Sequence, residues 1–215
     1  MSLPGLYAVV DAEVAFAHGW ALVDLAQAVL AGGATLVQVR GKALSSVELL
    51  EASRQVVAMA VPYRAAVVVN DRADLAVLSG AAGVHVGQDD LSPADARAIV
   101  GPDRLVGVST HSADQIAVAA GEPVDYIAVG PVFGTTTKHT GYDAVSLDLV
   151  RQAAATGKDV VAIGGVTLDR VPQVFAAGAT SVAVIADLLA GGDPTARTRA
   201  FMAVAAAARP AKAAL

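Results

Sequence analysis

Short apolar runs rich in β-branched residues recur along the whole chain, with room for one helix between each run and the next. The residues within a run are mostly apolar and do not alternate with polar ones, which is typical of parallel strands covered on both faces. Eight such runs are predicted to be strands: residues 6–11, 35–40, 65–71, 83–87, 105–110, 126–130, 159–165 and 181–186.

The segments between these runs carry helix signals. One ends in the glycine pair Gly32 and Gly33, and another begins with Ser92 and Pro93, as helices often do. Eight strands alternating with helices predict an α/β fold, a single (β/α)8 TIM barrel spanning residues 1–215. An open, doubly wound sheet is the alternative, but a count of eight favours closure. Helices are expected at residues 21–33, 92–101, 146–157 and 171–179.

Composition limits the class of protein. The 215 residues are 55% hydrophobic and 16% charged, which suits one compact domain and argues against disorder. No apolar run approaches the ~20 residues of a membrane span, and the start lacks a secretory-signal pattern, so a cytoplasmic protein with no membrane partner is expected. The absence of cysteine excludes disulfides, thiolate metal sites and a cysteine nucleophile. The oligomeric state stays open, a homo-oligomer included.

The charge of the chain argues against a nucleic-acid partner. Net charge is −5 and aromatic residues make up only 4%, so neither a basic stripe nor stacking platforms for bases are expected. An anionic ligand must therefore be bound by a local arrangement of side chains.

Polar residues gather where the predicted strands end. Barrels of this kind carry their chemistry at the carboxyl ends of the strands. Seven of the eight runs end in polar residues, glycines or a polar loop, which predicts an active site at that rim. The polar residues within the last residues of the second to fifth runs, or just after them, are Gln38, Arg40, Lys42, Asn70, Asp71, Asp90 and Ser109.

The last two runs predict a phosphate site. Gly164 and Gly165 let the backbone approach an anion closely, and a short extra helix is expected over residues 186–192. The alternative is that the glycines only cap helices. The carboxylate of Asp187 would oppose a phosphate unless it points away.

Asp71 and Asp90 end neighbouring strands, so both carboxylates could reach one ion. Mg²⁺ prefers few carboxylates, several waters and phosphate oxygens, and this pair would suffice. The alternative is that each carboxylate caps the helix that follows it. The cations Arg40, Lys42 and Lys138 favour the metal site over the capping alternative. A diphosphate leaving group requires a metal ion together with cationic side chains.

The loop "GPVFGTTTKHTGYD", residues 130–143, combines hydroxyl groups with one cation. A flexible ammonium such as that of Lys138 can meet a developing negative charge. Thr135, Thr136 and Thr137 offer hydroxyl and backbone donors around it.

Four further polar residues have two readings each. Gln38, inside a strand, must hydrogen-bond either a ligand or a neighbouring barrel layer, and the same holds for Ser109. His85 and His111 could each be a general base. His85 is instead interpreted as a satisfied core histidine and His111 as a neighbour of a helix cap, so neither is assigned a catalytic role.

Taken together, the motifs resemble those of the thiamine phosphate synthase family, from about residue 6 to residue 190. The family joins a pyrimidine diphosphate to a thiazole phosphate and releases pyrophosphate. The thiazole nitrogen carries no proton, so the reaction needs no strong base. The matching motifs, in the family's order and spacing, are "LVQVRGK", "VVVNDRADLA", "GVHVGQDDLS", "VGVSTH", "GPVFGTTTK", "AIGGVT" and "VAVIADLL".

The resemblance implies a set of site residues. Those expected to bind the pyrimidine diphosphate are Gln38, Arg40, Lys42, Asn70, Ser109 and Lys138. Those expected to bind the thiazole phosphate are Thr135, Thr136, Thr137, Gly165, Ile185 and Ala186. Asp71 and Asp90 would hold Mg²⁺, and the catalytic cations would be Arg40, Lys42 and Lys138.

Two residues depart from the family pattern. Gly41 stands where an acidic residue is usual, and Ala186 where serine is common, so a contact is lost at each position. The rival readings are a thiazole tautomerase of the same superfamily, which relies on a histidine, and a non-catalytic phosphometabolite-binding barrel. The joint presence of Asp71, Asp90 and Lys138 favours the synthase over both.

Overall fold

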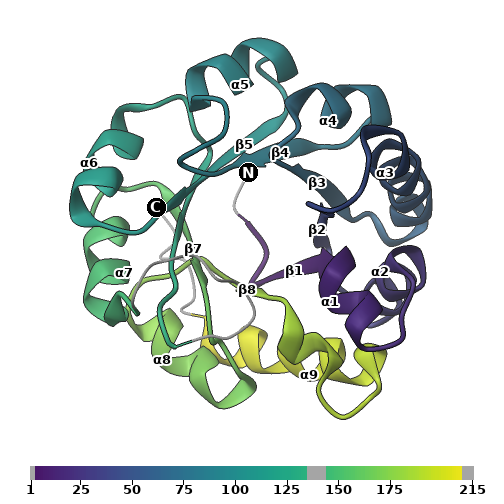
Figure 1. Ribbon diagram of the computed structural model, residues 1–215. Helices are drawn as coiled ribbons and strands as arrows, with labels where there is room; N and C mark the ends of the chain where they lie inside the picture. Colours follow the sequence, from purple (N-terminus) through teal and green to yellow (C-terminus); the bar gives the residue numbers. More distant parts are fainter. Residues whose placement is uncertain (1–2, 135–143, 210–215) are drawn as a thin grey trace.

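A ring of parallel strands surrounded by helices makes up the computed structural model, which describes residues 3–134 and 144–209 (Figure 1). Within these residues eight strands pair in chain order, and β8 pairs back with β1, so the barrel is closed. The predicted (β/α)8 barrel is confirmed, and the open sheet is excluded. The strands are β1 (Leu6–Asp11), β2 (Leu36–Arg40), β3 (Ala66–Asn70), β4 (Gly83–Val86), β5 (Leu105–Thr110), β6 (Tyr126–Val129), β7 (Asp159–Ile163) and β8 (Ser181–Val184).

Helices occupy the connections between the strands. The α-helices are α1 (Ala12–Ala17), α2 (Leu22–Ala31), α3 (Ser46–Ala60), α4 (Ala73–Ser79), α5 (Pro93–Val100), α6 (Ala113–Gly121), α7 (Ser146–Ala154), α8 (Val171–Ala176) and α9 (Pro194–Ala208). The short 3₁₀ helices are η1 (Val61–Tyr63), η2 (Leu168–Arg170) and η3 (Ala186–Leu189). The short helix expected after β8 is η3. None of the helices in the described residues is long and apolar enough to cross a membrane.

Side chains mark several helix starts. Ser92 caps α5 by accepting a hydrogen bond from the N–H of Asp95 at 3.1 Å, as the Ser-Pro start predicted. Asp11 caps α1 by accepting from the N–H of Val14 at 3.0 Å. Helix α1 was not anticipated, and it places Asp11 at the rim where β1 ends.

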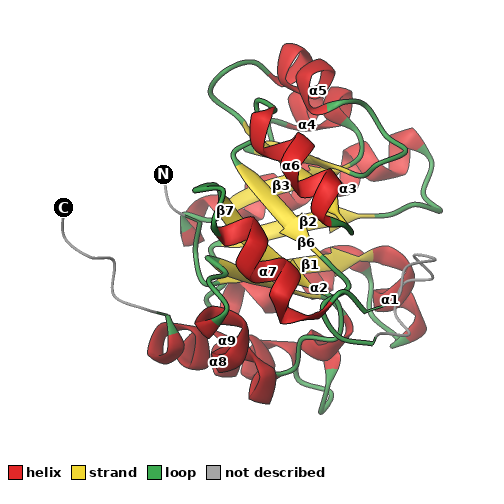
Figure 2. Cartoon of the chain, turned by 90° about the vertical axis from the view of Figure 1, so that its left-hand side faces the viewer, coloured by secondary structure: helices red, strands yellow, loops and turns green. Residues whose placement is uncertain are grey.

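The apolar core has two layers, because the strands are covered on both faces. The outer layer packs strand residues such as Val37 and Val69 against the surrounding helices, which enclose the strands in side view (Figure 2). The inner layer fills the barrel itself, and Tyr7 and Tyr126 are its two largest fully buried side chains. The barrel interior is therefore a packed core, and Tyr7 and Tyr126 bring hydroxyl groups into it.

Gly107 makes room for Tyr126 inside the barrel. A Cβ atom at Gly107 would lie 2.0 Å from Cζ of Tyr126, so any side chain at this position must displace the ring. We expect Gly107→Ala to lower the free energy of unfolding by about 1–3 kcal/mol, as overpacked cores do. Urea denaturation would measure this loss of unfolding free energy.

Gly121→Ala is the matched control, since a Cβ atom on Gly121 meets nothing within 4 Å. Its stability should be unchanged or higher by up to ~1 kcal/mol. Equal stability of the two variants would show that Tyr126 is not tightly packed against Gly107.

Candidate active site

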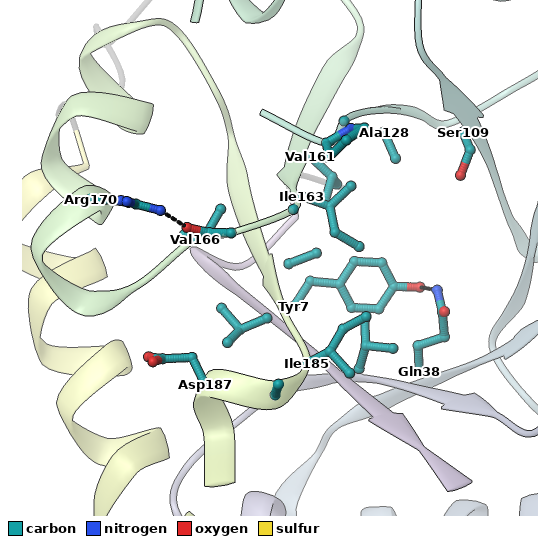
Figure 3. A pocket seen from close by; sticks show the side chains of 18 of the residues that line it. Tyr7, Gln38, Ser109, Ala128, Val161, Ile163, Val166, Arg170, Ile185 and Asp187 are labelled. Atoms are coloured by element: carbon teal, nitrogen blue, oxygen red, sulfur yellow. Dashed lines mark hydrogen bonds between the residues drawn. The ribbon is translucent and has the colours of Figure 1, made fainter. Parts of the chain in front are cut away.

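A cavity of about 580 Å³ opens where β5 to β8 end, and residues of β1, β2 and β4 also line it (Figure 3). Much of its wall is apolar, including Ile163 and Val166. A cavity with apolar walls and a few polar groups is the usual form of a small-molecule site. The predicted site residues that line it are Gln38, Ser109, Gly165, Ile185 and Ala186.

A chain of hydrogen-bonded side chains runs below the cavity. Gln38 donates from Nε2 to the hydroxyl of Tyr7 at 2.8 Å, and that hydroxyl lies 3.0 Å from the hydroxyl of Tyr126. The hydroxyl of Tyr126 lies 3.1 Å from Nδ1 of His85, and Nε2 of His85 lies 2.8 Å from Oγ of Ser109. Burial raises the pKa of both tyrosines well above the ordinary value, so both stay protonated. The chain thus links Gln38 to Ser109 through the barrel interior.

Arg40 is held by carboxylates at the ends of β1 and β2. It makes a short hydrogen bond to Asp11 and lies 3.7 Å from Oε2 of Glu13. Burial alone would raise the pKa of Asp11, but the N–H of Val14 and the guanidinium of Arg40 together hold it below the usual value. Nε of Arg40 is buried and has no hydrogen-bond partner in the described part of the chain. The sequence analysis overlooked Asp11, whose only signal was an acidic residue at the end of the first strand.

The two predicted metal ligands do come together. Burial, and then the neighbouring carboxylate of Asp90, raises the pKa of Asp71, while Lys42 opposes the shift from 3.2 Å. Asp71 adopts a left-handed backbone conformation with φ of 63°, and Asp90 accepts from the N–H of Gly87 at 2.7 Å. Two adjacent carboxylates, one of which raises the pKa of the other, form a site that favours a cation.

Neither carboxylate caps the helix that follows it, so the capping alternative is wrong. The N-cap of α4 is Arg72, without a side-chain cap, and the N-cap of α5 is Ser92. Over the described ranges no group of three or more His, Cys, Asp or Glu residues could hold a metal. The hard oxygen pair of Asp71 and Asp90 nevertheless fits Mg²⁺, which completes its shell with water and substrate phosphate oxygens.

The glycines after β7 are required by close packing. A Cβ atom on Gly164 would lie 2.4 Å from Cα of Pro131, and one on Gly165 would lie 2.6 Å from the carbonyl oxygen of Gly134. Both have positive φ, 94° and 64°, which side chains rarely adopt. These glycines shape the cavity wall next to Ile185 and Ala186.

Asp187 does not face this wall as a bare charge. Its carboxylate pairs with Arg197 of α9 at 2.7 Å, which removes the electrostatic objection to a phosphate here. The sequence had left open whether Asp187 points away, and the ion pair with Arg197 answers that question.

Arg170 is a cavity residue that the sequence analysis missed. It donates from Nη1 to the carbonyl of Gly165 at 2.6 Å, and its guanidinium lies 4.6 Å from the ring centre of Phe133 (Figure 3). No carboxylate among the described residues pairs with it. It therefore brings positive charge to the glycine end of the cavity, offset in part by the neighbouring carboxylate of Asp169. A cation five residues beyond the glycine pair was the available signal.

The remaining predicted residues differ in where the structure places them and in what they contact. Asn70, 7% exposed, ends β3 opposite His85 and makes no side-chain hydrogen bond to a described residue. His85 and His111 both line the cavity, so His85 is a bonded core histidine and a wall residue at once. A Cβ atom on Gly41 would lie 2.6 Å from Cδ1 of Leu44, so a side chain at this position would have to displace the side chain of Leu44. Thr135, Thr136, Thr137 and Lys138 lie outside the described residues.

Comparisons with known proteins agree with this geometry. Residues 6–188 match the sequence profile of the family described as thiamine monophosphate synthase. The chain belongs to the thiamine monophosphate synthase family. It is 46% identical to the thiamine-phosphate synthase of Koribacter versatilis over 95% of this chain and 97% of that protein. It is 41% identical to that of Anaeromyxobacter dehalogenans over 98% and 91%.

The fold comparison gives the same family. The solved thiamine phosphate pyrophosphorylase of Pyrococcus furiosus superposes with a TM-score of 0.86 at 26% identity, covering 95% of this chain and 96% of that one. Close relatives of the thiamine monophosphate synthase family are thus similar to this chain over nearly its whole length.

The ion pair of Asp11 and Arg40 should make the free energy of unfolding depend on pH. Replacing the buried carboxylate in Asp11→Asn leaves Arg40 only the longer contact to Glu13 and should cost on the order of 3 kcal/mol at pH 7. Because the folded-state pKa of Asp11 is lowered, its contribution is present above the unfolded value of about 3.9 and is lost as pH falls through the folded value. The difference between wild type and Asp11→Asn should therefore shrink in acid.

Chemical denaturation between pH 7 and pH 2.5 would measure this. Asp103→Asn, in the exposed turn before β5, is the control and should track the wild type throughout. A stability gap for Asp11→Asn that stays constant over the whole range would contradict the ion pair.

Proposed function

We propose that the protein is a thiamine-phosphate synthase. It transfers the pyrimidinylmethyl group of 4-amino-2-methyl-5-(diphosphooxymethyl)pyrimidine to the nitrogen of a thiazole phosphate, giving thiamine phosphate and pyrophosphate. The observation that carries the proposal is the adjacent pair of carboxylates, Asp71 and Asp90, with Lys42 beside it, in the loops that follow β2, β3 and β4. The similarity to curated thiamine-phosphate synthases supports it.

The diphosphate end of the substrate lies at the ends of β2 to β4 in this proposal. Arg40, Lys42 and Asn70 meet the phosphate oxygens, with Ser109 at the cavity side. Asp71 and Asp90 would hold Mg²⁺, which when bound would neutralise charge on the departing diphosphate. Lys138 is assigned to the same leaving group by the resemblance alone.

Bond cleavage needs charge stabilisation and no proton removal. The electron pair of the C–O bond leaves with the diphosphate, and the aminopyrimidine ring stabilises the methylene cation left behind. The lone pair of the thiazole nitrogen then forms the new C–N bond. Arg40 and Lys42 act where negative charge develops, which is the effect that contributes most in such sites. The apolar walls keep water from capturing the cation.

The thiazole phosphate occupies the β7 and β8 end. Gly165, Ile185 and Ala186 form its binding surface, with Thr135, Thr136 and Thr137 assigned by resemblance. Ala186 offers a backbone N–H without the hydroxyl that serine would add, a loss of about 1 kcal/mol at most. Arg170 supplies positive charge at this end. An enzyme of this type would act in the cytoplasm, where we place it.

The reaction tests the proposal directly. Protein mixed with both substrates and Mg²⁺ should release pyrophosphate, and a chelator should stop the release until Mg²⁺ is restored. Asp90→Asn keeps the acceptor for the N–H of Gly87 but removes the charge, so kcat should fall by about 10²–10³. Coupled detection of pyrophosphate would measure both effects.

Asp89→Asn, one residue away and exposed, is the matched control and should keep wild-type turnover. No pyrophosphate from the wild-type protein would reject the synthase. Isomerisation of a thiazole carboxylate without Mg²⁺ would instead identify the tautomerase, and phosphate binding without turnover would identify a binding barrel.

Arg170 should affect the binding of the thiazole phosphate and not the binding of the pyrimidine diphosphate. Arg170→Gln removes a charged hydrogen-bond donor from the glycine end, so KM for the thiazole phosphate should rise at least about tenfold. KM for the pyrimidine diphosphate should not change. Steady-state kinetics with each substrate varied in turn would measure the two KM values separately.

The unphosphorylated thiazole alcohol provides an internal check. Wild type and Arg170→Gln should use the alcohol equally poorly, because it has no phosphate for Arg170 to meet. Arg72→Gln, which removes a surface pair with Asp74, is the control variant. A similar loss with the alcohol would mean that Arg170 only supports the loop of Gly165.

A further inference from the structure

Asp187 brings a negative charge to the end of the cavity where the phosphate of the thiazole is proposed to bind. It follows Ala186 directly in the chain, and it is the only carboxylate among the described residues that line the cavity. Its side chain is 18% exposed, so water screens the charge only in part. A bare carboxylate in this position should repel a phosphate group.

Arg197, in α9, pairs with this carboxylate. Its Nη2 and Nε donate to Oδ2 of Asp187 at 2.7 and 3.2 Å, and Nε also lies 3.2 Å from the carbonyl oxygen of the same residue. In the close view the carboxylate points away from Tyr7 and Ile185 (Figure 3). The ion pair thus holds the charge of Asp187 away from the centre of the cavity.

Arg197 is itself held in place by its own helix. Its guanidinium carbon lies 5.6 Å from the ring centre of Phe201, one turn further along α9. Phe201 is fully buried, so its ring supports the guanidinium from a fixed position. Arg197 does not line the cavity. It can therefore act on a bound ligand only through its charge and through Asp187.

Opposite charges are balanced at this end of the cavity. The hydrogen bond from Thr167 lowers the pKa of Asp169, and the charges of Arg170 and Arg197 lower it further, so both cations lie near this carboxylate. Arg170 and Arg197 thus stand against Asp169 and Asp187. Loss of Arg197 would leave an excess of negative charge, and loss of the charge on Asp187 would leave an excess of positive charge.

We propose that Arg197 is a positioning residue for the thiazole phosphate, which holds Asp187 against α9 and compensates its charge so that the cavity accepts a phosphorylated ligand. The inference rests on the proposed function, because it assumes that the phosphate occupies the end of the cavity formed by Gly165, Ile185 and Ala186. It goes beyond that function by giving a role to a residue that touches neither substrate.

Arg197→Met removes the compensating charge and leaves the carboxylate of Asp187 without this partner. KM for the thiazole phosphate should rise by about tenfold, because a negative charge then faces the phosphate across a poorly screened wall. Turnover at saturation and KM for the pyrimidine diphosphate should not change. The unphosphorylated thiazole alcohol should be used as poorly as by the wild type. Steady-state kinetics with each compound would measure these values.

Asp187→Asn has the opposite effect on the charge. The amide keeps a side-chain oxygen for the guanidinium of Arg197, so the packing is conserved while the negative charge is lost. KM for the thiazole phosphate should fall by about threefold, because the remaining charge is positive. If Arg197→Met fails to fold, as circular dichroism would show, this variant decides alone, and an unchanged KM overturns the inference.

The double variant separates charge from structure. In Asp187→Asn combined with Arg197→Met both charges are gone, so KM for the thiazole phosphate should return to within about threefold of the wild-type value. A purely structural role predicts no such rescue, because the contact of Arg197 with the carbonyl of Asp187 is still missing. A double variant as impaired as Arg197→Met would therefore overturn the inference.

Arg97→Met is the matched control. Arg97 also pairs with an aspartate, Asp125, at 2.6 Å and donates to a carbonyl, that of Pro123, but it lies before β6 at the opposite end of the barrel from the site. Its loss should lower stability and leave both KM values unchanged. A rise in KM for the thiazole phosphate as large as in Arg197→Met would overturn the inference while the synthase stands. Failure of the wild-type protein to release pyrophosphate would instead reject the proposed function itself.

Discussion

The hydrogen bonds between β1 and β8 are the constraint on which the site depends. They pair Leu6 with Val182 and Ala8 with Val184, and so join the first strand of the chain to the last. On the other side of β1, Asp11 lies in register with Arg40, which explains why these two side chains meet. Closure thus brings Tyr7 of β1, Gln38 of β2 and the glycine wall after β7 around one cavity.

A closed barrel of eight strands has little room inside, and this makes its interior part of the chemistry. Polar groups that enter the interior must satisfy one another, because an unpaired buried donor is costly. Tyr7 and Tyr126 do so through their hydroxyls, and their rings fill the inner core beside Gly107. The residues that pack the barrel below the cavity are therefore also the residues that orient its polar walls.

Local signals in the sequence were sufficient for the fold and for much of the rim. Apolar runs located all eight strands to within two residues, because strands covered on both faces leave an unmistakable pattern. The glycine pair, and Asp71 with Asp90, were recognisable because strand ends converge in any such barrel. The chain of Tyr7 and Tyr126 was not, since those residues lie 119 positions apart and meet only on closure. Arg170 and Asp11 were also not recognised, because the helix α1 that Asp11 caps was not anticipated and Arg170 reaches the carbonyl of Gly165 only once the loop after β7 has folded.

The charges of the described site are largely paired before any substrate arrives. Arg40 is 13% exposed and bound to Asp11, and Lys42 is paired with Asp71. Such pairing weakens the attraction of each cation for a bound anion, because part of its field is already compensated. It also fixes the position of the guanidinium before binding, so little reorganisation is needed when negative charge develops on a leaving group. A chain with net charge −5 can in this way direct positive charge at one place without attracting anions elsewhere. Tight binding of the ground state contributes nothing to turnover, whereas a cation held in position for the transition state does. The carboxylates beside Arg40 and Lys42 are thus consistent with a site that acts on a departing polyanion, even though they lower its affinity for the intact one.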